Sequence, residues 1–205
     1  PFIVDKNTLI PRPETEELVA WIIKEASKIK LQKGKKISIL DIGTGTGCIA
    51  ISLAKNIPKT HISALDISED ALKIAKQNTL LNNVEIDFYE IDILNTNSLP
   101  QQFDIIVSNP PYVRESEKIG IKKNVLQNEP HIALFVENEN PLLFYKKIAD
   151  LAKKYLSEKG ILFFEINQYL EKETGKMLEK KGFKNIDLRK DLFGNYRMIQ
   201  CNITL

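Results

Sequence analysis

Residues 37–47 read Ile-Ser-Ile-Leu-Asp-Ile-Gly-Thr-Gly-Thr-Gly, and this stretch decides the fold class of the chain. The mostly apolar residues 37–42 indicate a strand. Apolar residues at helical spacing from Cys48 to Lys55 indicate a helix directly after the glycines. Continuous apolar strands are typical of a parallel sheet that helices cover on both faces. The stretch therefore predicts a strand, turn and helix unit of an α/β fold.

The same alternation of strands and helices continues on both sides of this unit. Further strands are expected at 61–65, 84–91, 103–108 and 161–166, and helices at 14–30, from Ser68, from Asn140 and at 169–181. Two strand-like runs, 183–188 and 197–203, close the chain. The short connection between them fits an antiparallel hairpin rather than a crossover. We therefore expect a Rossmann-like α/β fold with a seven-stranded, mostly parallel sheet, an antiparallel last strand and helices on both faces.

Composition excludes several classes of protein. The 205 residues are 43% hydrophobic and 27% charged, with a formal net charge of +2, which fits one globular domain without a strong attraction to nucleic acid or membranes. No apolar run is long enough to cross a bilayer, and no secretory signal is apparent at the start of the chain. Two cysteines, Cys48 and Cys201, form neither a disulfide framework nor a zinc site. We expect a cytoplasmic, monomeric protein with no metal.

Polar residues gather where the expected strands end, which is where open parallel sheets bind ligands. The loop Gly43-Thr44-Gly45-Thr46-Gly47 has the spacing G-x-G-x-G, unlike the dinucleotide fingerprint G-x-G-x-x-G or a phosphate-binding P-loop. Asp66 ends the next strand, where a carboxylate can accept hydrogen bonds from ribose hydroxyls. A tight turn at the glycines and a helix-capping role for Asp66 remain the structural alternatives.

No lysine or arginine lies near the loop in sequence to balance a pyrophosphate. A nucleoside without phosphates therefore fits better than a dinucleotide. S-adenosylmethionine is such a ligand, and the acidic residues Asp41, Asp66 and Asp92 suit its positive charge. Asp92 can accept from the adenine amino group and Ile93 can cover the ring, although Asp92 also fits as a plain turn residue.

The most specific signal is Ser108-Asn109-Pro110-Pro111-Tyr112, which follows the strand at 103–108. The two prolines fix a rigid turn and leave carbonyls free. The Asn109 side-chain oxygen and the Pro110 carbonyl can grip both hydrogens of a planar amino group, and the Tyr112 ring can stack on its plane. Such a grip positions a nitrogen lone pair for transfer of a methyl group.

These motifs resemble class I S-adenosylmethionine-dependent methyltransferases that act on planar amino nitrogens. Residues 9–16, Leu-Ile-Pro-Arg-Pro-Glu-Thr-Glu, are more specific and resemble the HemK/PrmC family. The family methylates the side-chain amide of the glutamine in the Gly-Gly-Gln motif of peptide chain release factors. The segments Asn128-Glu129-Pro130 and 191–197, Asp-Leu-Phe-Gly-Asn-Tyr-Arg, also fit it.

The resemblance implies roles for individual residues. The cofactor site would comprise Gly43, Thr44, Gly45, Thr46, Gly47, Asp66, Asp92, Ile93 and Asn109. Catalytic roles fall to Asn109, Pro110 and Tyr112, and substrate contacts to these together with Pro111, Arg12 and Glu129. Family members often carry an aromatic residue where this chain has Ile93. Residues 1–13 would be an extended hairpin or linker from an N-terminal helical domain, and residues 14–205 the methyltransferase domain.

Two other functions remain open. An adenine-N6 methyltransferase on DNA or RNA would use the same turn on an exocyclic amine, but it should show a basic face, whereas the net charge is only +2. A non-catalytic module that binds an adenosyl ligand would keep its ligand binding after replacement of Asn109 by alanine and would have no activity to lose. Release factors as protein substrates, with no membrane and no direct nucleic-acid contact, are the expected partners.

Overall fold

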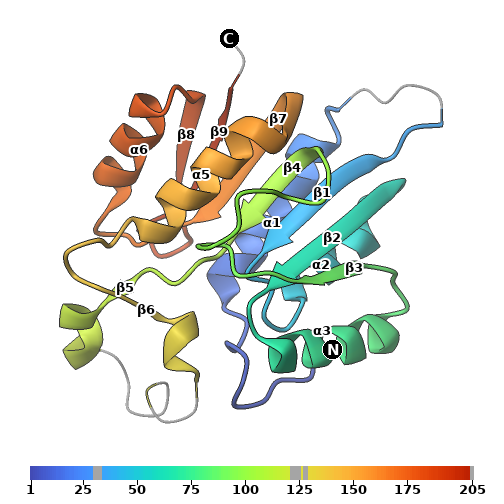
Figure 1. Cartoon of the computed structure of the whole chain (residues 1–205), viewed down its shortest axis with the longest axis horizontal. Helices are drawn as coiled ribbons and strands as arrows, with labels where there is room; N and C mark the ends of the chain where they lie inside the picture. The colour runs from blue at the N-terminus through green and yellow to red at the C-terminus, as the bar shows by residue number, and fades with distance from the viewer. Residues whose placement is uncertain (30–33, 121–125, 127–128, 204–205) are drawn as a thin grey trace.

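The structure, a computed structural model, describes residues 1–29, 34–120, 126 and 129–203. Its centre is a seven-stranded sheet in the order β3-β2-β1-β4-β7-β9-β8 (Figure 1). These strands are β1 (Ile37–Ile42), β2 (Thr60–Asp66), β3 (Asp87–Glu90), β4 (Phe103–Ser108), β7 (Leu156–Glu165), β8 (Lys184–Lys190) and β9 (Tyr196–Asn202). Strand β9 is antiparallel to both β7 and β8, while the pairs from β3 to β7 are parallel. The predicted sheet is confirmed.

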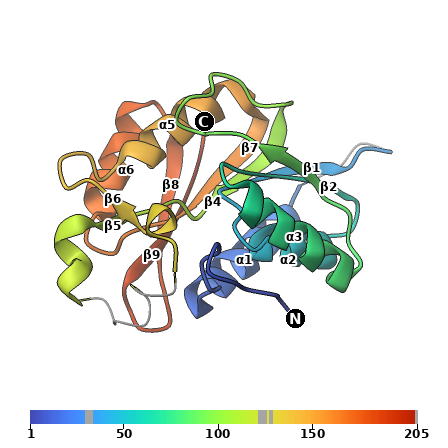
Figure 2. The same cartoon turned by 60° about the horizontal axis from the view of Figure 1, so that its bottom comes forward.

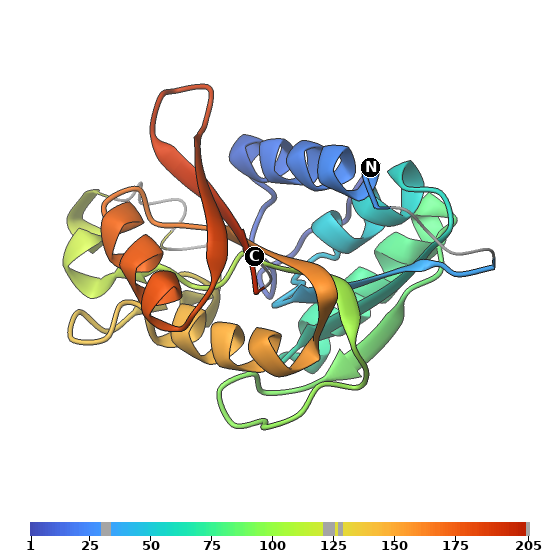
Figure 3. The same ribbon diagram turned by 90° about the horizontal axis from the view of Figure 1, so that it is seen from above.

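Helices cover both faces of the sheet, as the apolar strands require. They are α1 (Pro13–Ala26), α2 (Cys48–Asn56), α3 (Glu69–Asn82), α5 (Leu143–Tyr155) and α6 (Glu171–Lys180). Figure 3 shows α1, α2 and α3 on one face and α5 and α6 on the other. Two short strands, β5 (Val113–Arg114) and β6 (Phe135–Val136), pair outside the main sheet beside α5 and α6, with the 3₁₀ turns Glu115–Gly120 and His131–Ala133 (Figure 2).

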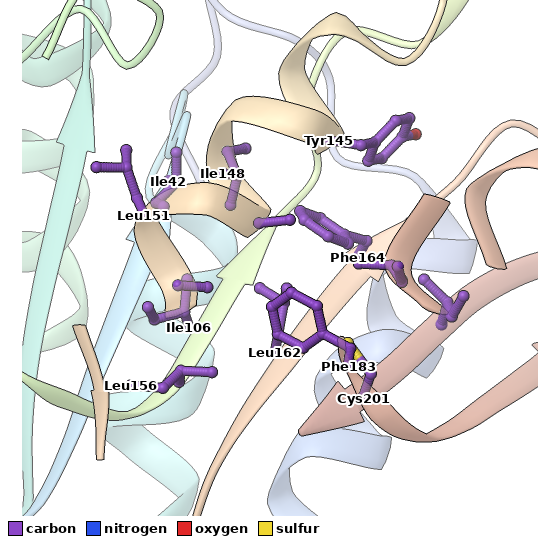
Figure 4. Packing of buried hydrophobic residues seen from close by; sticks show 14 of the residues in the cluster. Ile42, Ile106, Tyr145, Ile148, Leu151, Leu156, Leu162, Phe164, Phe183 and Cys201 are labelled. Carbon is purple, nitrogen blue, oxygen red and sulfur yellow. The ribbon is translucent and has the colours of Figure 1, made fainter. Parts of the chain in front are cut away.

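Each face of the sheet has its own apolar core. Under α5, the Tyr145 ring meets Phe164 of β7 edge to face, with centroids 5.1 Å apart, and Ile148 packs beside them (Figure 4). On the opposite face, Trp21 of α1 meets Phe163 in the same way at 5.4 Å. Neighbouring residues of β7 therefore anchor helices on opposite faces, which fixes α1 beside the end of this strand.

Several boundaries differ from the sequence prediction, each for a local reason. Strand β3 starts later than residue 84, because the N–H of Val84 closes the end of α3 on Thr79 and Asn83 adopts a left-handed conformation. Strand β7 starts at Leu156, before the predicted residue 161, and its pairing with β4 contains a register shift. Glu158 and Lys159 are exposed polar residues in this part of the strand, so the sequence there lacks the apolar run that indicates a strand. Helix α1 ends at Ala26, and residue 30 of the predicted helix lies outside the described residues.

The first residues of the chain contact α3, and a turn follows at Asp5–Thr8. All twelve residues are described, and they contain no strand. The main chain of Ile3 instead pairs with the side chain of Asn78 in α3, at 2.7 Å from its N–H and 3.0 Å to its carbonyl. The segment before the turn therefore binds a helix.

Candidate cofactor and substrate site

The carboxyl ends of four neighbouring strands bring the candidate residues together. Ile42 of β1 lies opposite Leu65 of β2 and Ser108 of β4, and Ser108 lies opposite Phe164 of β7. The residues that follow these positions are therefore adjacent in space although they are far apart in sequence. The hydroxyl of Ser108 also donates to the carbonyl of Ile42 at 2.7 Å, which joins the start of the glycine loop to the start of the Asn-Pro-Pro-Tyr turn.

The glycine loop presents open space on one side and packs on the other. Gly43 and Gly45 have φ values of 72° and 54°, which favour glycine, and a Cβ at either would meet no atom within 4 Å. A Cβ at Gly47 would lie 3.1 Å from Ile51 and 3.3 Å from Ala75, so this glycine lets α2 and α3 approach each other. The loop thus has the form of a cradle whose first two glycines leave room for a ligand.

Asp66 ties the glycine loop to the start of α3. Its Oδ2 accepts from the N–H of Gly45 at 2.9 Å and its Oδ1 from the N–H of Ser68 at 3.0 Å. Ser68, not Asp66, caps α3 by accepting from Ala71. Each carboxylate oxygen has two lone pairs, so both oxygens retain capacity for ribose hydroxyls. Burial raises the pKa of Asp66, as expected for a carboxylate in a partly enclosed site.

Asp41 is fully buried beneath the loop and only half satisfied. Its Oδ2 accepts from the Thr44 hydroxyl at 2.6 Å and from the Ala50 N–H at 3.3 Å, whereas Oδ1 has no partner among the described residues. Burial raises the pKa of Asp41 to about 7, and the nearby charge of Asp66 adds to the effect. A cation bound over the loop would favour the charged form of Asp41, so the site suits a positively charged ligand.

Substitution of Asp41 by asparagine should stabilise the protein increasingly as the pH rises. The folded-state pKa lies above the unfolded value, so the folded carboxyl binds more protons and wild type loses stability on passing from the unfolded pKa to about pH 7. The variant has no charge to bury. Between about pH 5.5 and about pH 7.5, its advantage in unfolding free energy should grow by about 2 kcal/mol. Urea unfolding at several pH values measures both free energies. If the unfolding free energies of wild type and Asp41→Asn change with pH in parallel, the prediction is wrong.

Asp92 and Ile93 occupy a tight turn after β3. The Asp92 carboxylate accepts from the Leu94 N–H at 2.9 Å and from the Asn95 side chain at 2.6 Å. Ile93 is 8% exposed and belongs to the core beneath α5. The N–H of Ile91 donates to the carbonyl of Asp66 at 2.9 Å, so this turn lies next to Asp66. Both expected adenine contacts thus lie at the same edge of the sheet, with Asp92 also serving the turn role.

The turn from Asn109 to Tyr112 is anchored at both ends. The Asn109 Nδ2 lies 3.5 Å from the hydroxyl of Thr15 in α1, and the Tyr112 hydroxyl donates to Glu165 at 2.9 Å. Asn167 donates from Nδ2 to the Tyr112 carbonyl at 2.9 Å. Pro110 and Pro111 lie between these anchors and donate no main-chain N–H. The side chain of Asn109 and the Pro110 carbonyl therefore stand on a braced segment.

Sequence reasoning missed three members of this site, Thr15, Glu165 and Asn167, as individual residues. Glu165 ends the apolar run of β7 and is 1% exposed. The rule that located Asp66 and Asn109, a polar residue at the carboxyl end of a buried strand, applies equally to Glu165. Thr15 offers no such signal, because only the packing of α1 against β7 brings its hydroxyl within 2.7 Å of Glu165.

Arg12 and Glu129 meet each other. The Arg12 Nη2 lies 2.6 Å and 2.8 Å from the two carboxylate oxygens of Glu129, whose side chain is 2% exposed. Arg12 is also the residue that precedes α1, and its carbonyl accepts from the N–H of Thr15 at 3.1 Å. The ion pair therefore fixes the start of α1 where Thr15 projects. Asn128 of the same segment lies outside the described residues.

Other kinds of site are not seen in the part of the chain that the structure describes. It holds no group of three or more His, Cys, Asp or Glu side chains that could bind a metal ion. None of its helices has the length and apolar character that a bilayer span requires.

The sheet order with an antiparallel β9 beside β7, together with the glycine loop, defines the fold of class I S-adenosylmethionine-dependent methyltransferases. A family model, the methyltransferase small domain, matches residues 25–191. The ribosomal protein L11 methylase of Lactobacillus delbrueckii subsp. bulgaricus has the same fold, with a TM-score of 0.67 at 19% identity over 97% of this chain and 82% of that one.

The chain belongs to the release factor glutamine methyltransferase family, the HemK/PrmC family. It is 61% identical over 202 residues to the release factor glutamine methyltransferase of Flavobacterium psychrophilum, which covers 98% of this chain and 70% of the relative. The protein of that name from Bacteroides thetaiotaomicron is 44% identical over 202 residues, with the same coverage of both chains. The resemblance identified from residues 9–16 is confirmed.

Proposed function

We propose that this protein transfers a methyl group from S-adenosylmethionine to the side-chain amide nitrogen of the glutamine in the Gly-Gly-Gln motif of peptide chain release factors. The observation that carries the proposal is the braced turn from Asn109 to Tyr112 beside an open glycine cradle. The relatives are named release factor glutamine methyltransferases, which supports the choice of substrate. Residues 14–205 form the methyltransferase domain in this proposal, and residues 1–13 are the linker segment before it.

The residues around the glycine cradle fit the cofactor. Gly43 and Gly45 leave space for close approach, Asp66 has acceptor capacity for ribose, and the unpartnered oxygen of Asp41 suits a nearby positive charge. Asp92 and Ile93, in the turn next to Asp66, would contact the adenine. When bound, S-adenosylmethionine supplies an electrophilic methyl group, and no metal is required for that chemistry.

The chain's own residues position the glutamine amide. The Asn109 side-chain oxygen and the Pro110 carbonyl would accept the two amide hydrogens, which aims the nitrogen lone pair and offsets the positive charge that develops on nitrogen. Tyr112 supplies a ring beside this plane while its hydroxyl is held by Glu165. The nitrogen loses a proton only after methylation, so the residues need to orient and stabilise rather than to abstract a proton first.

The proposal predicts methyl transfer to one glutamine of a release factor. Purified protein, isotopically labelled S-adenosylmethionine and a bacterial release factor should give labelled factor, and mass spectrometry should find one added methyl on the Gly-Gly-Gln peptide. Replacement of that glutamine by alanine in the factor is the matched control and should abolish the label. Equal labelling of both factors, or labelling only of an adenine-containing oligonucleotide, would contradict the proposal.

A further inference from the structure

Both ends of the Asn109–Tyr112 turn converge on one buried carboxylate. Glu165 Oε1 accepts from the Tyr112 hydroxyl at 2.9 Å, and Oε2 accepts from the Thr15 hydroxyl at 2.7 Å. Glu165 is 1% exposed and Thr15 is 5% exposed, so water has little access to either hydrogen bond. The three residues come from β7, from α1 and from the turn after β4, which are elements separated by up to 150 positions in sequence.

This arrangement fixes which way each hydroxyl points. A carboxylate is an acceptor only, so Thr15 and Tyr112 must both donate their single proton to Glu165. Burial raises the pKa of Glu165 above its ordinary value, and the hydrogen bonds from Thr15 and Tyr112 and the positive charge of Arg197 only partly offset this effect. The directions of the two hydrogen bonds rest on the geometry, because both carboxylate oxygens of Glu165 face a hydroxyl group.

The direction of the Thr15 hydrogen bond determines whether the nitrogen or the oxygen of the Asn109 side-chain amide faces Thr15. Having donated its proton, Thr15 Oγ1 can only accept, and it lies 3.5 Å from Asn109 Nδ2. That contact is long, but the reverse orientation of the amide would set two acceptor oxygens against each other. The nitrogen of Asn109 therefore faces Thr15, which leaves the oxygen for the substrate.

We propose that Glu165, acting through Thr15, is a positioning residue that selects the amide orientation in which the Asn109 oxygen faces the substrate nitrogen. The inference rests on the proposed function and adds to it a source of orientation outside the Asn-Pro-Pro-Tyr turn. Without Glu165 and Thr15, the side-chain amide of Asn109 can rotate by about 180°. Its NH2 group would then face the NH2 group of the substrate amide, and no hydrogen bond could form between them. The pair acts on the chemical step and not on recognition of the release factor surface.

The variant that tests the pair is Thr15→Val, which keeps the shape of the side chain and removes the hydroxyl. We expect kcat for methylation of the release factor to fall roughly tenfold, with KM unchanged, because one orienting hydrogen bond is lost. Thr15→Ser should restore most of the rate. Thr174→Val is the matched control, since Thr174 is a buried threonine of α6 whose hydroxyl bonds to Leu170 at 2.8 Å, and it should leave kcat unchanged.

A double-mutant cycle separates positioning from a structural role. If Thr15 acts through Asn109, Thr15→Val should have no further effect on kcat in the Asn109→Ala background. Glu165→Gln should also lower kcat, because an amide offers its NH2 group to one of the two hydroxyls and reverses that hydrogen bond. Additive losses in the cycle, or a Thr15→Val loss matched by Thr174→Val, would overturn the proposal.

A readout without catalysis keeps the proposal separate from the proposed function. In ¹⁵N-labelled protein without cofactor, the side-chain amide resonances of Asn109, assigned by their absence in Asn109→Ala, should shift in Thr15→Val and Glu165→Gln but not in Thr174→Val. If wild type does not methylate release factors, the proposed function fails, and these resonances still decide the inference. Unchanged Asn109 resonances in both site variants would overturn it.

Discussion

Replacement of Asn109 by alanine should lower kcat/KM for release factor methylation by about 10²-fold. The substitution removes the side-chain acceptor for one amide hydrogen, which costs roughly 1–3 kcal/mol when that donor is left unpaired. Misorientation of the attacking nitrogen adds a loss of up to about 10²-fold. Steady-state transfer of a labelled methyl group measures the effect.

Two controls accompany this variant. Asn56→Ala removes an exposed asparagine of α2 that bonds only to the Ser52 carbonyl among the described contacts, and its rate should match wild type. Unfolding free energies of both variants show that each is folded at the assay temperature. A rate for Asn109→Ala within about threefold of wild type would remove the central role assigned to this residue.

Replacement of Arg12 by methionine should cost about 3 kcal/mol of unfolding free energy. The substitution removes the only described partner of the Glu129 carboxylate, whose side chain is 2% exposed, and an uncompensated buried charge is strongly destabilising. Because Arg12 immediately precedes α1, we also expect the placement of Thr15 to loosen and kcat to fall. Urea unfolding at neutral pH gives the free energy.

The matched control for Arg12→Met is Lys73→Met. Lys73 pairs with Glu69 and Asp70 on the exposed surface of α3, where solvent screens ion pairs and they add little to stability. The double variant Arg12→Met with Glu129→Leu should recover most of the lost stability, because no charge is then buried. A loss for Arg12→Met no larger than that for Lys73→Met would mean that the buried pair does not hold the start of α1.

Much of the fold was predictable because its strands are buried on both faces. Residues 37–42 and 103–108 are apolar enough to be read without any partner, and the short 189–196 connection indicated the antiparallel end of the sheet. The predicted ends of helices and strands were wrong where tertiary contacts, rather than the local sequence pattern, decide them. Val84 closes α3 instead of extending β3, and β7 continues back to Leu156 through exposed polar residues.

In the candidate site, too, some residues could be predicted from the sequence and others could not. The glycine loop, Asp66 and Asn109 were recognisable because each lies at the carboxyl end of a strand, and the carboxyl ends of parallel strands share one edge of the sheet. The residue pairs that hold this site together were not recognisable from the sequence. Arg12 and Glu129 are 117 positions apart and Thr15 and Glu165 are 150 positions apart, and no local periodicity links such residues.

The sequence by itself determined the alternation of strands and helices, the family and the segments that carry the chemistry, because these depend on burial patterns and short motifs that act locally. Only the tertiary structure decided how these segments are held. It places α1 against β7, so that a single carboxylate, Glu165, accepts from Tyr112 and from Thr15, whose hydroxyl also lies beside Asn109. The physical reason is that hydrogen bonds depend on distances of about 3 Å, which the packing of the whole domain sets.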